Sequence, residues 1–487
     1  MMIKKSMLNK SSFKEEKNLC KSTKFDPIIP AWLVWIQCVA FVVLYTVWIL
    51  PEIVGFRNAA LVVGMLASLY SIYQYRFILL QKSALSIWCI IVLFIWTIVH
   101  LLFFSQDYEL QLIELKRIWK YTAISSIFAL GLGLSLASKN FLIDTSSSQR
   151  NSQYWPLILF GLTTPLLIYL IKYGLTTYGA KLGIEAPIFL RIYFSSQPYY
   201  IPKSDYVAFC LPPLAIALGQ IYILISRNQK LMLRDYGKII VYLSIIKATL
   251  FLFYTQNIKN GIAYSIACIG LFIILILLKK NYTKWWKKKL IIVVVVGVLS
   301  SWTYPHIQKN DSWETLVEDV RIAFQTEKYQ HWKYAGEQGY PKNEIGKTVS
   351  ITNYERAAWL KIGTKLAFQN PFGYGLIEDS FKFMVKSNWS DASLNLSHTH
   401  SGWLDLVLAI GLPGFFLVMG ALLSLLYQSR NISNHWHAVV FWGLIANAFL
   451  WITVEASSTI LFPALIFWLC FSAGICICLH ESRLKSI

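Results

Sequence analysis

The stretch NLSHTHSGWLDLVLAIGLPG, residues 395–414, joins two kinds of sequence. Its first part is polar and carries His398 and His400, and its second part is an almost unbroken apolar run. Polar side chains are costly in hydrocarbon, whereas a long apolar run is stable there as a helix. The change near Ser401 therefore predicts the point at which an extramembrane loop enters a membrane helix.

Apolar runs of this kind recur along the whole chain. Of its 487 residues, 56% are hydrophobic and only 14% are charged, and the mean hydropathy is +0.50. A soluble domain carries more charge on its surface. A run of roughly 17–25 apolar residues can cross the ~30 Å hydrocarbon core of a bilayer. We therefore predict an all-α polytopic integral membrane protein with about twelve transmembrane helices. The predicted spans are residues 30–50, 57–73, 84–104, 118–138, 155–174, 205–226, 238–255, 261–279, 288–303, 402–427, 436–454 and 458–480. Gly411 and Pro413 predict that the span at 402–427 is divided into two shorter pieces.

The basic residues predict how these helices are oriented. The formal net charge is +20, and lysines and arginines concentrate in the N-terminal tail and in alternate loops at residues 227–238 and 279–289. Basic residues flank membrane helices mainly on the cytoplasmic side. The tails at residues 1–29 and 481–487 are therefore expected in the cytoplasm. The same pattern predicts contact with anionic membrane lipids and no binding of nucleic acid.

This orientation defines the domain boundaries. Residues 30–303 are expected to hold nine transmembrane helices, with an outer loop near residues 175–204. Residues 304–399 are expected to form a large periplasmic loop, and residues 400–480 the last three transmembrane helices.

Two short helices are predicted inside the large loop. At residues 311–325 apolar residues recur at helical spacing, and that face is expected to lie on the membrane surface or on the bundle. The face consists of Trp313, Val317, Val320 and Phe324. In the second helix, Thr352 and Glu355 have the spacing of a capping box, and Asn370 with Pro371 ends the helix. Its apolar stripe is Ala358, Ile362 and Leu366.

The predicted topology places His398 and His400 at the boundary between water and lipid. Ser401 is expected to be the N-cap of the next helix, and the field at a helix N-terminus disfavours protonated imidazole. A neutral histidine can take a proton from a hydroxyl group, and histidine serves as a general base more often than any other residue. The alternative is that both histidines are only polar surface groups of an exported loop.

The spacing around His400 resembles the signature of the O-antigen ligase family, which shares a domain with O-antigen polymerases and bacterial protein O-oligosaccharyltransferases. The family signature of His, then Asn, Ser or Gln, nine residues, Gly, two residues and Gly reads here as His400, Ser401, Gly411 and Gly414. The family often has a small residue or Tyr three positions later, where this chain has Leu417.

Three cations extend the resemblance. The segment YERAAWLKIGTKLAFQNPFGYG, residues 354–375, looks like the family's Arg-containing helix, which ends in a Pro-x-Gly-x-Gly turn, and it supplies Arg356. Lys259 stands in TQNIKNGIA where the family often has an Arg, and Arg191 lies in the other outer loop, where the family has a basic residue. An ordinary surface position for Arg356, and contact of Lys259 and Arg191 with lipid phosphate, are the alternatives.

The resemblance implies a chemistry and a location. The family transfers a glycan from undecaprenyl diphosphate to an acceptor hydroxyl, such as one on lipid A-core, at the periplasmic face of the bacterial inner membrane. It implies inverting, metal-independent transfer with no other cofactor. His400 would be the general base, and His398 would orient the acceptor or serve instead. Arg356, Arg191 and Lys259 would hold the diphosphate, because a leaving group that gains negative charge is stabilised by cations.

Other interpretations stay open. Within the family, a polymerase of O-antigen or surface polysaccharide and a protein O-oligosaccharyltransferase are alternatives. A transporter of lipid-linked sugars would carry charged residues deep in several spans. By sequence only Lys120, Lys247 and Glu455 approach that description, each near the end of a span. A structural or partner-recruiting membrane protein would leave the histidine motif unexplained.

Overall fold

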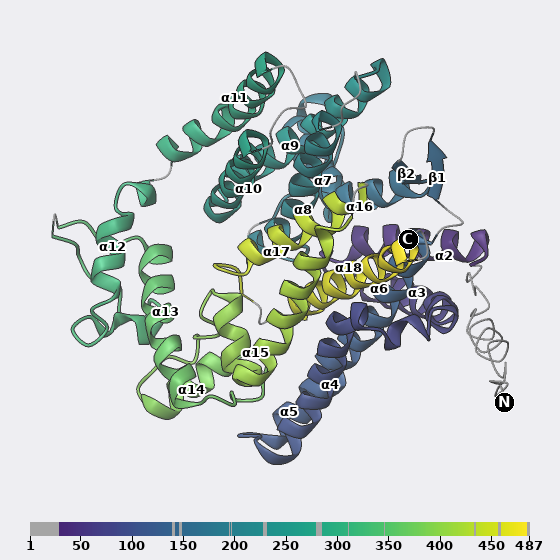
Figure 1. Ribbon diagram of the computed structural model, residues 1–487. Coiled ribbons are helices and arrows are strands. Elements are labelled where there is room, and N and C mark those ends of the chain that lie inside the picture. The colour runs from purple at the N-terminus through teal and green to yellow at the C-terminus, as the bar shows by residue number, and fades with distance from the viewer. Residues whose placement is uncertain are drawn as a thin grey trace, which may run out of the picture.

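The chain folds into a mostly helical bundle with a smaller helical unit beside it (Figure 1). The computed structural model describes residues 29–138, 142–145, 149–193, 195, 197–226, 231–278, 285–309, 311–344, 346–432, 435–455 and 459–484. Most of the N-terminal basic tail and parts of both basic loops lie outside these ranges. One short antiparallel hairpin departs from the all-α prediction, and it consists of β1 (Leu142–Thr145) and β2 (Gln149–Ser152).

The helices of the bundle follow the predicted spans. The long ones are α2 (Ala31–Val47), α3 (Val54–Gln74), α4 (Leu85–Phe103), α6 (Lys120–Ala137), α7 (Trp155–Tyr178), α8 (Lys203–Ile225), α9 (Leu233–Thr255), α10 (Lys259–Leu278), α11 (Trp285–Lys309), α15 (Gly402–Ser429) and α18 (Leu461–Leu484). α5 (Tyr108–Glu114) continues into α6 through a π-helical turn, and α16 (His435–His437) continues into α17 (Gly443–Leu450) in the same way.

The length and composition of these helices make the chain a multi-pass membrane protein. Within the described residues, nine helices are long and apolar enough to cross a membrane, and two shorter apolar helices cover residues 31–47 and 435–450. Each of the predicted spans overlaps a helix. The continuous segment from α5 to α6 is 30 residues long, which is more than the roughly 20 that a bilayer requires. Its first turns are therefore available to contact the unit beside the bundle.

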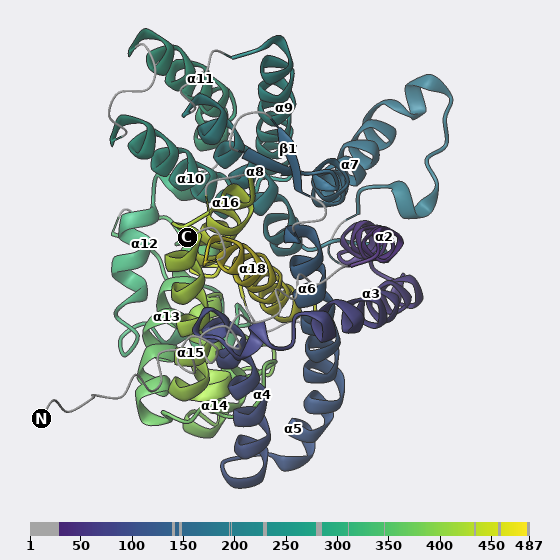
Figure 2. The same ribbon diagram turned by 45° about the vertical axis from the view of Figure 1, so that its right-hand side comes forward.

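The centre of the bundle is the contact between α6 and α18, which Figure 2 shows side by side. Glycines let the two backbones approach closely, because a Cβ at Gly133 would lie 2.3 Å from the carbonyl oxygen of Phe471. On the other helix, a Cβ at Gly474 would lie 2.5 Å from the carbonyl oxygen of Leu130. Small residues are a common means of packing helices in membranes, where dispersion contacts replace the hydrophobic driving force.

The large loop folds into a helical unit with its own core, seen as the green helices of Figure 1. It contains α12 (Leu316–Ala323), α13 (Ile351–Gln369) and α14 (Ser380–Asn388), and it packs against α15. The predicted stripe of α13 is confirmed, since Ala358, Ile362 and Leu366 are all buried. The predicted end is confirmed as well, because the helix stops at Gln369 before Asn370 and Pro371.

One detail of this unit differs from the prediction. Thr352 and Glu355 form no capping box, because α13 begins two residues earlier with Ser350 as the N-cap, and Glu355 instead accepts a hydrogen bond from the Tyr340 hydroxyl. On the predicted apolar face, Val317 is 80% exposed and Phe324 is 45% exposed, whereas Val320 packs against the core of the unit. Contact of this face with the membrane surface or the bundle stays a prediction. Asp319 takes the inward position, where its Oδ2 accepts hydrogen bonds from the Thr315 hydroxyl and the Asn353 amide, while its buried Oδ1 has no partner among the described residues. No local sequence pattern indicates these two hydrogen-bond partners.

The predicted division of the span at 402–427 is confirmed at Gly411. This residue has φ 69° and ψ 179°, a conformation that is essentially restricted to glycine, and it interrupts α15. Pro413 adds to the break, because it has no N–H to donate to the carbonyl of Ala409. The interruption therefore leaves backbone carbonyls of α15 without helical partners.

The Pro-x-Gly-x-Gly turn after α13 fills this gap. The Tyr374 N–H donates to the carbonyl of Leu408 at 2.7 Å, and the Gly375 N–H donates to the carbonyl of Ala409 at 2.8 Å. The Trp96 indole of α4 donates to the carbonyl of Ile410 at 2.7 Å. Both glycine motifs of the sequence thus meet at one backbone junction, which fixes α13 and α15 relative to each other.

Candidate functional site

The two histidines lie in a tight turn just before α15. His400 has φ 58°, a left-handed conformation that is uncommon for a residue with a side chain. Asp405 holds the turn, since its Oδ1 accepts hydrogen bonds from the Thr399 N–H at 2.8 Å and from the Thr399 hydroxyl at 2.6 Å. Ser401 is the N-cap residue as predicted, but its side chain makes no capping hydrogen bond. The strained position of His400 is therefore set by Asp405, one turn into the helix.

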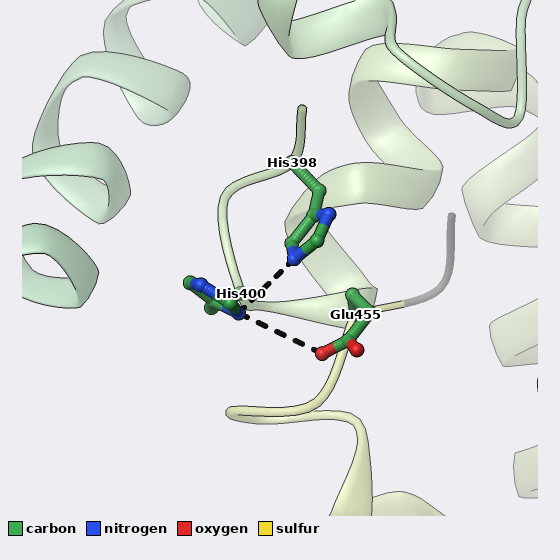
Figure 3. Close-up of side chains that lie close together, drawn as sticks. All are labelled: His398, His400 and Glu455. Carbon is green, nitrogen blue, oxygen red and sulfur yellow. Dashed lines mark hydrogen bonds and ion pairs between the residues drawn. The ribbon is translucent and has the colours of Figure 1, made fainter. Parts of the chain in front are cut away.

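His398, His400 and Glu455 form a compact cluster (Figure 3). Nε2 of His398 lies 3.1 Å from Nδ1 of His400, and Oε2 of Glu455 lies 3.6 Å from that same Nδ1. On its other side, Nδ1 of His398 lies 2.8 Å from the Ser397 hydroxyl. Two neighbours thus converge on one nitrogen of His400.

The other nitrogen of His400 stays available. Within the described residues, no hydrogen bond involves its Nε2, and 27% of the side chain is exposed. The ring stacks on Trp359 of α13 with the centroids 5.5 Å apart and the planes 21° apart. An imidazole with its Nδ1–H oriented by an acceptor has its Nε2 lone pair free, which is the arrangement of a general base.

The surroundings of His398 favour its neutral form. Burial lowers the pKa of His398, and a positive charge on His400 would lower it further. For Glu455, burial alone would raise the pKa, but the contact with His400 and the charge of His398 hold that pKa below its usual value. A carboxylate beside two imidazoles can therefore stabilise the proton that the cluster takes up.

Glu455 reaches the cluster because its loop is fixed from two sides. The carbonyl of Trp451 accepts a hydrogen bond from the N–H of Trp403 at 3.1 Å, which ties the loop to the start of α15. Thr453 makes a hydrogen bond with the Tyr264 hydroxyl, which ties it to α10. Sequence reading placed Glu455 only as a charge near the end of a span, and its distance of 55 positions from His400 gave no signal for the contact.

Arg356 lies on the same face of α13 as Trp359, the residue that stacks on His400. They are three positions apart, so they are neighbours on the helix surface. The Nε of Arg356 is buried and has no hydrogen-bond partner among the described residues. Burial lowers the pKa of the guanidinium, while the charge of Glu455 opposes that shift. A partly buried guanidinium without a hydrogen-bond partner beside a histidine cluster is suited to bind an anionic group.

The other two predicted cations have protein partners. Lys259 donates to Asn353 Oδ1 at 2.6 Å and to the carbonyl and hydroxyl of Ser312, each at 3.0 Å. An ammonium has three donors, so these contacts occupy all of them. Arg191 is exposed and donates through Nε to the carbonyl of Ala186 at 2.8 Å. The structure thus brings Arg356 next to the histidines, keeps Lys259 close enough for its charge to act on Arg356, and leaves Arg191 in its own loop.

Comparison with known proteins agrees with the motif around His400. Residues 243–419 match a family model described as O-antigen ligase. These residues are an O-antigen ligase family domain. The match includes Lys259, Arg356, His398 and His400, and it ends inside α15. No match was found among curated proteins. The resemblance inferred from the motif is therefore confirmed for residues 243–419.

The ligase domain alone does not complete the cluster. Glu455 lies beyond its end, in the loop between α17 and α18. Two imidazoles and one carboxylate, with ligand atoms within 4.8 Å of one another, also have the composition of a site for zinc or a similar metal ion. A chelator would inactivate a metal site and leave a hydrogen-bonded base unaffected.

Proposed function

We propose that the protein transfers a glycan from undecaprenyl diphosphate to an acceptor hydroxyl at the periplasmic face of a bacterial inner membrane. The acceptor that we propose is lipid A-core. The observation that carries this proposal is the arrangement of His400, whose Nδ1 is contacted by His398 and Glu455 while its Nε2 stays free. Arg356 supplies a cation beside that base, and its guanidinium makes no hydrogen bond to any residue that the structure describes.

The proposed reaction is an inverting displacement without a metal ion. The acceptor hydroxyl gives its proton to Nε2 of His400 as its oxygen attacks C1 of the donor sugar. The bond from C1 to the diphosphate oxygen breaks on the opposite side, and the diphosphate leaves with the electron pair. Glu455 stabilises the imidazolium that forms, and His398 orients the ring or the acceptor.

Arg356 is the proposed clamp for the leaving diphosphate. Its planar guanidinium can bind two phosphate oxygens at once, and it does so best in a site that excludes water. Lys259 and Arg191 remain proposals for the same group. Their hydrogen bonds to Asn353, Ser312 and Ala186 support a weaker contribution, through charge rather than direct contact.

The proposed topology has twelve transmembrane helices, cytoplasmic termini and a periplasmic loop at residues 304–399. The alternation of basic loops supports it. Cysteine labelling with an impermeant reagent at Gly346 and Thr283 tests it. We expect labelling from outside at position 346 only, and external labelling at position 283 alone would place the histidine cluster on the cytoplasmic side.

The test of the activity is transfer by the purified protein in lipid nanodiscs. Undecaprenyl-diphosphate-linked glycan serves as the donor, and lipid A-core from a strain without that glycan serves as the acceptor. We expect glycan to appear on lipid A-core. Growth of the glycan on its own carrier would instead identify a polymerase, and transfer to a protein would identify a protein O-oligosaccharyltransferase.

A deletion strain makes the same distinction in cells. Loss of a ligase leaves long glycan on the lipid carrier, whereas loss of a polymerase leaves single repeats on the lipid core. The banding pattern of lipopolysaccharide therefore separates the two alternatives without a purified substrate.

A further inference from the structure

A second group of buried polar side chains lies beside Glu455 and has no part in the proposed chemistry. Asp205, in the first turn of α8, is 3% exposed. Its carboxylate makes no hydrogen bond to any described residue, and Oδ2 is fully buried. Two charged groups act on it, Glu455 and Arg57. Sequence reading did not include Asp205 among the charged residues within spans.

Three further atoms near Asp205 share this lack of partners. Nε of Arg57, at the start of α3, is buried without a hydrogen bond, although its Nη2 donates to the carbonyl of Leu50 at 2.8 Å. The hydroxyl of Tyr121 in α6 is buried without a partner, and the charge of Arg57 acts on it. The indole N–H of Trp48 is also buried without a partner among the described residues. The Trp48 ring lies 5.6 Å from that of Phe209, one turn along α8 from Asp205.

Buried polar groups without partners lower the stability of the folded protein unless a ligand binds them. Each buried polar group without a partner costs about 1–3 kcal/mol, so native proteins keep few of them. Ionisable residues inside a membrane protein usually mark a functional site. Here the four groups come from the ends of α2 and α3, from α6 and from α8, which are distant in sequence. The charge of Arg57 acts on both Asp205 and Tyr121, and the Trp48 ring packs against Phe209 of α8.

The mixture of groups narrows the chemistry of the ligand. The Glu455 carboxylate repels a diphosphate, and Arg57 repels a metal cation. An apolar chain would leave all four groups unsatisfied. Vicinal hydroxyls can donate to the Asp205 carboxylate and accept from the N–H groups of Arg57 and Trp48, and the Tyr121 hydroxyl can do either.

We propose that Asp205, Arg57, Tyr121 and Trp48 form a subsite that binds the hydroxyl groups of a sugar ring, joined to the His400 cluster through Glu455. This inference rests on the proposed function, because it takes the sugar to be part of a transferred or accepting glycan. The ring can belong to the acceptor or to the first residue of the donor glycan, and kinetics separate the two.

The experiment measures initial rates with the purified full-length protein in nanodiscs while each substrate is varied in turn. Asp205→Asn and Arg57→Gln are each expected to raise the KM of one substrate on the order of 10- to 100-fold, because a hydrogen bond to a charged group is lost. A rise in the acceptor KM assigns the ring to lipid A-core, and a rise in the donor KM assigns it to the carrier-linked glycan. Matched controls are Asp235→Asn, at the start of α9, and Arg76→Gln, beyond the other end of α3; both are expected to keep wild-type values.

A stability measurement separates a binding role from a structural role. Replacing an unpartnered buried carboxylate with an apolar group of similar size removes its desolvation cost. Asp205→Leu is therefore expected to raise the thermal unfolding temperature and also to raise the KM of one substrate. A lower unfolding temperature with an unchanged KM would identify Asp205 as a structural residue and overturn the subsite. Unchanged KM values for both substrates in an active protein would overturn the subsite alone, whereas no transfer by the wild type would overturn the proposed function and the subsite with it.

Discussion

The ligase domain at residues 243–419 and the helices that flank it contribute differently to the site. The domain carries His398, His400 and Arg356, the groups that we propose to react or to bind charge. The flanking helices carry Glu455, which contacts His400, and Asp205, whose charge interacts with Glu455. Asp405 and Trp359, which position His400, lie inside the domain, whereas Glu455 comes from a segment that has no motif. The predictions below test how far this division extends, beginning with the largest expected effect.

The largest effect is expected for His400. Replacement with Ala removes the proposed base, and general base catalysis typically contributes ~10²–10⁴-fold, so transfer should fall by that factor in a folded, inserted protein. The measurement is transfer in nanodiscs, and His331→Ala in the same loop is the control. Full activity of His400→Ala would exclude the base assignment.

A chelator tests the metal alternative for the same cluster. If the cluster works as a hydrogen-bonded base, wild-type transfer should be unchanged after treatment with EDTA. Loss of activity with EDTA, and its recovery on addition of zinc, would show that His398, His400 and Glu455 hold a metal ion instead.

Arg356 is expected to have the next largest effect. Removal of one contact that stabilises developing negative charge typically costs about 10²–10³-fold in rate, so Arg356→Ala should lower transfer to that extent. Arg356→Lys keeps the charge but loses the planar fork, and it should recover only part of the activity. Arg321→Ala is the control, because Arg321 is exposed in the same unit. Normal transfer by Arg356→Ala at normal protein levels would remove the clamp from the mechanism.

Glu455 tests the flanking region directly. Glu455→Gln keeps the size of the side chain but removes the charge beside Nδ1 of His400, and residues that orient a reacting group typically contribute roughly 10- to 100-fold. We expect transfer to fall by that factor, with Glu327→Gln as an exposed control. His398→Ala should be milder than His400→Ala if His398 only orients the ring. If Glu455→Gln matched the wild type, the ligase domain would not need Glu455 for catalysis, and the flanking segments would not contribute to the site in this way.

The sequence predicted what depends on local pattern. Apolar runs located the membrane helices, because length and hydropathy decide whether a segment can cross a bilayer. Gly411 and Pro413 predicted the break in α15, because backbone conformation at these residues is set locally. The roles of His400 and Arg356, which come from a resemblance carried by single segments, stay predictions.

The features that the sequence did not predict all depend on contacts between distant segments. Glu455 meets His400 only because hydrogen bonds at Trp451 and Thr453 fix a loop against two helices. Asp319 faces inward on α12, and its Oδ2 accepts a hydrogen bond from Asn353, a contact that no periodicity can indicate. Asp205 lies at the edge of an apolar run, where its burial depends on the neighbouring helices.

Replacement of Lys259 is expected to have the smallest effect on catalysis. It tests, within the ligase domain, which cation binds the donor. Lys259 lies in the matched segment, as Arg356 does, but its three donors are already bonded to Ser312 and Asn353. Lys259→Met should therefore leave buried acceptors without donors and lower the stability by about 1–3 kcal/mol, while transfer per folded molecule changes little. Thermal unfolding and transfer measured on the same preparation separate the two effects, and Lys347→Met, at an exposed position, is the control. The reverse result, a large loss of transfer with unchanged stability, would mean that Lys259 releases its protein partners to bind the diphosphate. In that case the free guanidinium of Arg356 and the bonded ammonium of Lys259 would be two states of one clamp, and hydrogen bonds in the unliganded site would not identify which cation binds the donor.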